Sequence, residues 1–157
     1  MAVVELLLPA EAAHVRTARL VVVMAARRAG LAEGLLDELR LAVGEACARA
    51  VGLHARHGLD DRVEVAVSDD VTGLSVSVTD HGLAAGPAVD DVAGGILHDQ
   101  GGADEDEVDP DVSLALLAGL VDEVQVTARD EGTTVTMRWP LRARIPGAAR
   151  PTVDSPV

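Results

Sequence analysis

The sequence predicts an α/β (α+β) two-layer sandwich, in which a mixed, mostly antiparallel sheet is covered by helices on one face. The chain has 157 residues, 48% of them hydrophobic, which suits a single domain with a substantial core. Some segments alternate apolar and polar residues with period two, and others carry apolar residues at three- and four-residue steps. Their order, β, α, α, β, β, long loop, α, β, β, is typical of such a sandwich.

The N-terminal third predicts one strand followed by two helices. VVELLL (3–8) is a short apolar run that Pro9 stops, which indicates a strand. A first helix is expected over 10–28, with Gly30 at its stop position, and a second over about 33–54. The expected core positions are Val15, Leu20, Val22, Val23 and Ala26 in the first helix and Leu36, Leu39, Val43, Ala46 and Ala50 in the second.

The rest of the chain predicts two hairpins and a helix. RVEVAVSD (62–69) and LSVSVTD (74–80) alternate with period two and are joined by a turn. DVSLALLAGLVDEV (111–124) is expected to be helical through about Leu120. VQVTA (124–128) and TTVTMRW (133–139) then form the last hairpin.

Asp80 is the first candidate site residue, because it continues the apolar face of its strand. Leu74, Val76 and Val78 share that face, and a carboxylate beside them is unfavourable unless it has a partner. This position favours a binding role for Asp80, with a turn former at the end of the strand as the alternative.

Composition excludes several classes of function. There are 26 acidic residues against 13 basic ones, giving a net charge of −13, and every basic residue is Arg. This balance disfavours nucleic-acid binding and favours a protein partner with a basic surface. The single cysteine, Cys47, excludes an internal disulfide and a Cys-rich zinc site. No segment is long and apolar enough to span a membrane, so we expect a cytoplasmic protein without a membrane partner.

The domain is expected to cover 1–140 and to contain a long loop at 81–110. Long loops inside domains are commonly functional or disordered, and this one is rich in glycine and acid. The Pro- and Arg-rich tail, 141–157, is expected to be disordered. Between positions 99 and 111 seven of thirteen residues are acidic: Asp99, Asp104, Glu105, Asp106, Glu107, Asp109 and Asp111.

Three segments resemble a known family. They are LDELRLAVGEACARAV (36–51), VTDHG (78–82) and SLALLAGLVDEVQV (113–126). Over roughly residues 3 to 140 the chain resembles the GHKL ATP-binding fold (Bergerat type), and most closely the anti-sigma-factor serine kinases of bacterial partner switching.

The resemblance implies roles for three residues. Glu45 stands where the family has the general base that polarises the attacking hydroxyl of a partner serine. Asp80 stands where the family carboxylate accepts from the adenine amino group, and Gly82 would let the backbone pass close to the base.

The chain departs from the family at the metal and phosphate positions. Arg49 replaces an asparagine that helps to hold Mg²⁺, and a guanidinium has no acceptor atom. Asp111 and Ser113 replace the glycines of the family's last glycine box. Each carboxylate of the acidic loop near a triphosphate would be repelled, by roughly 4 kcal/mol at ~4 Å and an effective dielectric near 20, before screening. We therefore expect no metal site and a weakened or lost ATP site, with ATP and Mg²⁺ binding only if the altered site still functions.

Plainer interpretations remain for each residue. Glu45 is also typical of a solvated helix carboxylate. Arg49 either points into water or fills the emptied phosphate site and pairs with Asp80 or the acidic loop. The histidines at 54, 57, 81 and 98 match no ligand spacing, which favours solvated or locally bonded side chains. Cys47 is expected to be a small core residue.

The leading functional hypothesis is an anti-sigma-like regulator. The resemblance implies a homodimer that binds a sigma factor of RNA polymerase and competes with an anti-anti-sigma protein of the STAS type. The first helix and the face that bears the loop are the expected contact regions. One alternative is an active ATP-dependent serine kinase that phosphorylates the STAS protein, with Glu45 as base. Another is a scaffold that keeps the fold and binds a different partner.

Overall fold

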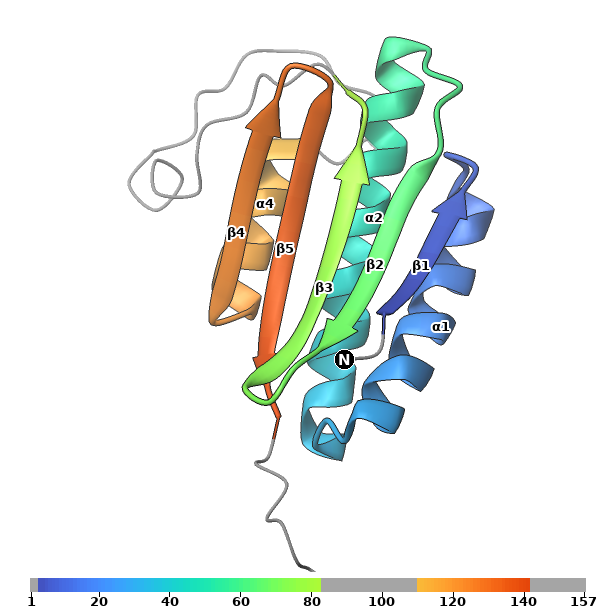
Figure 1. The fold of residues 1–157 in the computed structure, drawn as a ribbon. Helices are drawn as coiled ribbons and strands as arrows, with labels where there is room; N and C mark the ends of the chain where they lie inside the picture. The colour runs from blue at the N-terminus through green and yellow to red at the C-terminus, as the bar shows by residue number, and fades with distance from the viewer. Residues whose placement is uncertain (1–2, 83–109, 142–157) are drawn as a thin grey trace, which may run out of the picture.

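The computed structural model describes residues 3–82 and 110–141, which form a sheet with helices on one side (Figure 1). This confirms the predicted two-layer sandwich. The elements in chain order are β1 (Val3–Leu8), α1 (Ala12–Ala29), a 3₁₀ turn η1 (Glu33–Leu35), α2 (Leu36–His57), β2 (Val63–Asp69), β3 (Gly73–Asp80), α4 (Pro110–Leu120), β4 (Glu123–Arg129) and β5 (Gly132–Pro140).

The five described strands lie in the order β1-β2-β3-β5-β4, and each pairs antiparallel with its neighbour. The expected mixture of directions is therefore absent from these strands. One row of branched side chains crosses the whole sheet on the face that meets the helices: Leu6, Val65, Val78, Val135 and Val126. Because strand side chains alternate between faces, this register puts every second residue of each strand on the core side.

The core lies between that face and the helices. All five apolar positions expected in α2 are buried. In α1 the expectation for Leu20 is wrong, because its side chain is 57% exposed. Leu20 lies two residues from the fully buried Ala18 and Val22, which is roughly 200° around a helix, so it faces solvent.

Glycines in the left-handed region end both long helices. Gly30 (φ 93°) donates its N–H to the carbonyls of Ala26 and Arg27, at the predicted stop of α1. The second helix continues to His57, three residues beyond the predicted end, and stops at Gly58 (φ 61°). The last turn of α2 is rich in histidine and lacks apolar residues, so the apolar spacing ended before the helix did. The first stop signal is Gly58.

The opposite face of the sheet is lined by small hydroxyl side chains, such as Thr79 and Thr134, whose hydroxyl oxygens are hydrogen-bonded at 2.9 Å. No helix within residues 3–82 and 110–141 has the length and apolar character needed to cross a membrane.

Candidate functional site

The predicted site residues come from three elements that pack together. Glu45 and Arg49 lie on α2, and Asp80 and Gly82 lie at the C-terminal end of β3. Ser113 lies in the first turns of α4, which packs against α2 as β3 does. Long stretches of sequence separate these segments, and the fold brings Arg49 into contact with Asp80, whose carboxylate also contacts Gly82.

Arg49 and Asp80 form a buried ion pair. The Arg49 Nη1 donates to the Asp80 Oδ2 at 2.9 Å, and the two side chains are 5% and 2% exposed. The other carboxylate oxygen, Oδ1, accepts the N–H of Gly82 at 2.9 Å. The interpretation that Arg49 points into water is therefore wrong, and the alternative of pairing with Asp80 is confirmed.

The ion pair explains two features that the sequence pattern left unusual. Asp80 continues the core side of β3 and is 1% exposed, as its place on the apolar face predicted. Arg49 lies beside the small buried residues Ala46 and Ala50 of α2. A buried charge is tolerated when an opposite charge and further hydrogen bonds compensate for its lost hydration. Among the described residues Arg49 Nε has no hydrogen-bond partner, so this compensation is incomplete.

His54 holds the residues that follow Asp80. It is 1% exposed, and its Nδ1 lies 3.0 Å from the carbonyl oxygen of Asp61, while its Nε2 accepts the N–H of His81 at 2.9 Å. Sequence reasoning did not separate His54 from the other histidines. Local bonding was one of the two expectations for them, and it is confirmed for His54. Its place four residues after the core position Ala50, on the same face of α2, was the signal that could have found it.

Gly132 allows β5 to pass close to the same segment. Its φ of 149° is unfavourable for a side chain, and a Cβ there would lie 1.9 Å from the carbonyl oxygen of Asp80. The end of β3 is thus enclosed by α2 on one side and by the start of β5 on the other. Sequence reasoning missed this glycine, because it read as an ordinary turn residue.

Glu45 is half-buried one turn before Arg49. The two residues have the i,i+4 spacing of a helical pair, but the described ion pair of Arg49 is with Asp80 instead. Asp111 lies in the first turn of α4, and its side chain is outside the part of the chain that the structure describes. The acidic stretch from 99 to 109 is also outside it.

The described residues do not fit a magnesium nucleotide. Mg²⁺ requires oxygen ligands, and the guanidinium of Arg49 offers none. Both carboxylate oxygens of Asp80 already accept hydrogen bonds, Oδ2 from Arg49 and Oδ1 from Gly82, so an adenine amino group would compete with internal donors. Within residues 3–82 and 110–141 no three His, Cys, Asp or Glu side chains come together as a metal site.

A hollow of about 190 Å³ touches Asp80 but lies elsewhere. Thr79 and Thr134 line it with side chains on the open face of the sheet, whereas the Asp80 carboxylate faces α2. The hollow therefore gives no access to the ion pair from the helix side. Its complete lining is Glu64, Thr79, Asp80, His81, Arg129, Glu131, Gly132 and Thr134.

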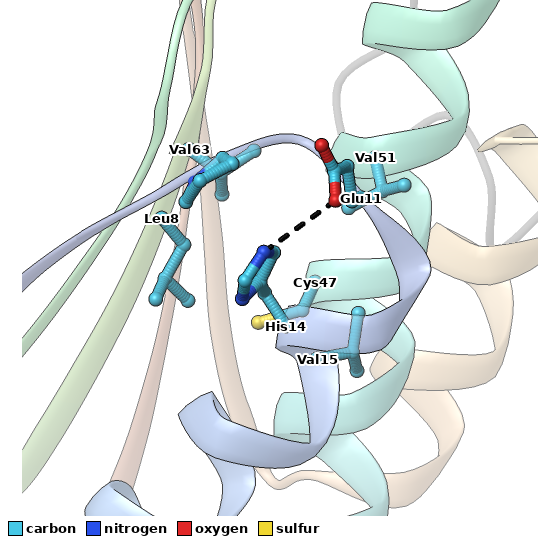
Figure 2. Close-up of a pocket in the computed structure, with 8 residues that line it drawn as sticks. Leu8, Glu11, His14, Val15, Cys47, Val51 and Val63 are labelled. Atoms are coloured by element: carbon cyan, nitrogen blue, oxygen red, sulfur yellow. Dashed lines mark ion pairs between the residues drawn. The ribbon is translucent and has the colours of Figure 1, made fainter.

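Cys47 lines a second, very small cavity of about 10 Å³ between β1, α1 and α2 (Figure 2). On its wall the His14 Nε2 lies 3.5 Å from the Glu11 Oε2. Burial raises the pKa of the Cys47 thiol to about 12, against a weaker opposing effect of Arg19, so the thiol is protonated at neutral pH. Cys47 is a core residue, as expected, and the cavity is too small for a ligand larger than water.

The fold and the position of the α2–β3 site define a GHKL-type ATPase domain. The histidine kinase-like ATPase domain family matches residues 8–139, and the chain belongs to that family. The structure is similar to the RsbU and RsbW domains of Rv1364c from Mycobacterium tuberculosis, with a TM-score of 0.54 and 19% sequence identity. That match covers 90% of this chain and 34% of the other, so this chain spans about a third of its length. At this identity the likeness shows the fold. No curated protein matches the sequence.

Proposed function

We propose that this chain is a partner-switching regulator of the anti-sigma type that works without bound nucleotide. In this proposal it binds a sigma factor, a STAS anti-anti-sigma protein, or each in turn. Three observations support the proposal. The chain belongs to the histidine kinase-like ATPase domain family, and its fold is similar to a structure named for an RsbW domain. Its segments 36–51, 78–82 and 113–126 also resemble anti-sigma kinases. The proposed loss of nucleotide binding rests on the buried ion pair between Arg49 and Asp80.

The ion pair opposes nucleotide binding through its own stability. Separating one partner of a buried pair costs about 3–5 kcal/mol, because the other charge stays buried. A base that displaced Arg49 from Asp80 would lose that amount, a factor of roughly 10²–10³ or more in affinity. A nucleotide would also meet a cation in place of a magnesium ligand. These effects support a binding role over an enzymatic one.

The outer face of α1 supports a protein partner. Between Ala12 and Ala29 the helix carries four arginines and no acidic residue, in a chain whose net charge is −13. Leu20 and Met24 lie one turn apart on this face and are 57% and 69% exposed. Exposed apolar side chains beside uniform charge are typical of interaction surfaces. The partner segment that would complement this face is apolar with acidic flanks, whereas the acidic remainder of the chain favours a basic partner surface.

The docking half of the proposal is tested with defined partners. The chain is mixed with each purified sigma factor and STAS protein encoded beside its gene or in its genome, and complexes are measured by calorimetry. We expect at least one complex, and we expect the double change Leu20→Glu and Met24→Glu to weaken it at least tenfold. Val71→Glu is the matched control, because Val71 is 93% exposed in the β2–β3 turn, away from the helices. If no sigma factor or STAS protein binds, the proposal is wrong.

The nucleotide half is tested separately. Millimolar Mg·ATP should leave the melting temperature of the wild-type protein unchanged, since a ligand that binds the folded state raises it. A rise of several degrees, together with transfer of the γ-phosphate to a STAS serine, would instead establish the serine-kinase alternative. In that case Glu45, which is half-buried and outside the ion pair, is the base to replace by Gln.

A further inference from the structure

We propose that the hollow on the open face of the sheet is an anchor site for an arginine side chain of a partner protein. The hollow has a volume of about 190 Å³ and lies at the end of β3, on the side of the sheet away from the helices. It is separate from the Arg49–Asp80 pair and takes no part in the proposed function. The partner is defined here by its chemistry, as a protein segment that presents an exposed guanidinium.

The register of the strands explains why the sheet is hollowed at this point. Glu64, Thr79 and Thr134 lie in one row across β2, β3 and β5, and the hydroxyl oxygens of the two threonines are 2.9 Å apart. Gly132 at the start of β5, which pairs with Arg129 of β4, brings no side chain. In the strand order the threonines lie between Glu64 and Arg129, so short hydroxyl side chains separate the longer, charged ones.

Three exposed, charged side chains line the hollow. Glu64 comes from β2, Arg129 from the end of β4 and Glu131 from the turn before β5. Within residues 3–82 and 110–141 none of the three side chains forms an ion pair or a hydrogen bond. Two carboxylates against one guanidinium leave one negative charge in excess, and the net charge of −13 on the chain adds to the preference for a cation.

The size of the hollow suits a single side chain. At about 30 Å³ for each molecule of liquid water, its volume corresponds to roughly six waters. Pockets that enclose drug-sized ligands and cofactors measure roughly 300–1,000 Å³, so this hollow is too small for a nucleotide. One long side chain that enters from a partner surface fits, and buried arginine anchors are typical of the residues that dominate binding energy at interfaces.

A guanidinium matches these groups better than an ammonium does. Its five N–H donors lie in one plane and can reach two carboxylates, here those of Glu64 and Glu131 on opposite sides of the hollow. The hydroxyl oxygens of Thr79 and Thr134 are neutral acceptors between them. Arg129 opposes the binding, because it brings a like charge to the same hollow. Each glutamate therefore raises the affinity and Arg129 lowers it.

The test is a nuclear magnetic resonance titration of the ¹⁵N-labelled protein with Nα-acetyl-arginine amide. We expect the largest chemical-shift changes at the backbone amides around the hollow, at positions 64, 79–81 and 131–134. Nα-acetyl-citrulline amide is the matched control ligand, because its side chain has nearly the same shape but no charge. It should bind roughly fivefold more weakly, the upper range for one exposed ion pair.

Four variants test the signs of the individual contributions. Glu64→Gln and Glu131→Gln should each weaken binding of the arginine derivative by roughly two- to fivefold, and Arg129→Gln should strengthen it by a similar factor. Glu123→Gln is the matched control and should change nothing. Glu123 and Arg129 are the two ends of the seven-residue strand β4, which puts them roughly 20 Å apart, beyond a screening length of about 8–10 Å.

Equal affinities for the arginine and citrulline derivatives would overturn the inference. So would shift changes that centre away from the hollow, or an affinity that neither Glu64→Gln nor Glu131→Gln lowers. The four substituted side chains are exposed, so the variants should keep the wild-type melting temperature within a few degrees. Because no sigma factor, STAS protein or nucleotide enters the titration, its failure is distinct from failure of the proposed function.

Discussion

Replacing Arg49 by Met should destabilise the protein by about 3–5 kcal/mol, because it leaves the Asp80 carboxylate buried without its cation. For a chain of this size that corresponds to a fall in melting temperature of roughly 6–20 °C. Asp80→Asn should also destabilise, because its single oxygen can accept from Arg49 but its NH2 would then face the N–H of Gly82, and the Arg49 cation would stay buried without a counter-charge. The double variant should be less destabilised than the sum of the two single variants by about 0.5–3 kcal/mol, as expected for residues in contact.

Urea unfolding measures these free energies through the only tryptophan. Trp139 is 2% exposed and its indole N–H donates to Glu38 at 2.8 Å, so unfolding changes its environment completely. Arg40→Met is the matched control on the same helix, because the Arg40–Asp37 pair at 3.0 Å is largely exposed and is worth no more than ~0.5 kcal/mol. Equal losses for Arg49→Met and Arg40→Met, or additive single losses in the double variant, would refute the buried pair.

Three further predictions test other contacts of the fold. Gly132→Ala should destabilise the protein by several kcal/mol, because the new Cβ would lie 1.9 Å from the backbone carbonyl oxygen of Asp80 in β3. Gly52→Ala in α2 is the control, because its Cβ would meet nothing within 4 Å and should stabilise the helix by roughly 0.5–1 kcal/mol. Urea unfolding measures both changes. Cys47, whose pKa burial raises to about 12, should react with a thiol reagent in native protein far more slowly than in urea-unfolded protein at the same pH. Hydrogen bonds from Thr72 and Arg138 lower the pKa of Asp70. The ionised carboxylate therefore adds a small stabilisation that is present above about pH 4 and is lost in stronger acid. Asp70→Asn should remove this pH-dependent stabilisation, as unfolding measured at several pH values would show.

The spacing of apolar residues predicted the helices and strands, because the burial of one face of an element imposes that spacing on its sequence. The alternation in 74–80 identified the core side of β3, and the three- and four-residue steps of α2 identified five buried positions. Leu20 shows the limit of that reasoning. Apolar residues nearly surround the middle of α1, so composition alone did not reveal which of them face the sheet and which face solvent.

The sequence allowed the buried carboxylate of the site, Asp80, to be predicted, but not its buried cation, Arg49. Asp80 interrupts an apolar face, which is a local signal that a single strand carries. The burial of Arg49 depends on two segments 31 residues apart meeting in space, and the contacts of His54 also arise only from the fold. Glu45 and Arg49 have the i,i+4 spacing of a helical pair, yet Arg49 pairs with Asp80 from another element.

The Arg49–Asp80 pair has a larger consequence for geometry than for stability. Buried ion pairs are often no more stabilising than apolar residues of the same shape, and within residues 3–82 and 110–141 Arg49 Nε finds no hydrogen-bond partner. What the pair does provide is a fixed position for Asp80, which in turn holds the Gly82 N–H. Together with the contact between His54 and His81, it attaches α2 to the end of β3 at two points. In this chain α2 and the end of β3 are bridged by the contacts of Arg49 with Asp80 and of His54 with His81. A closed α2–β3 site is therefore compatible with a partner-binding role in which no nucleotide is required.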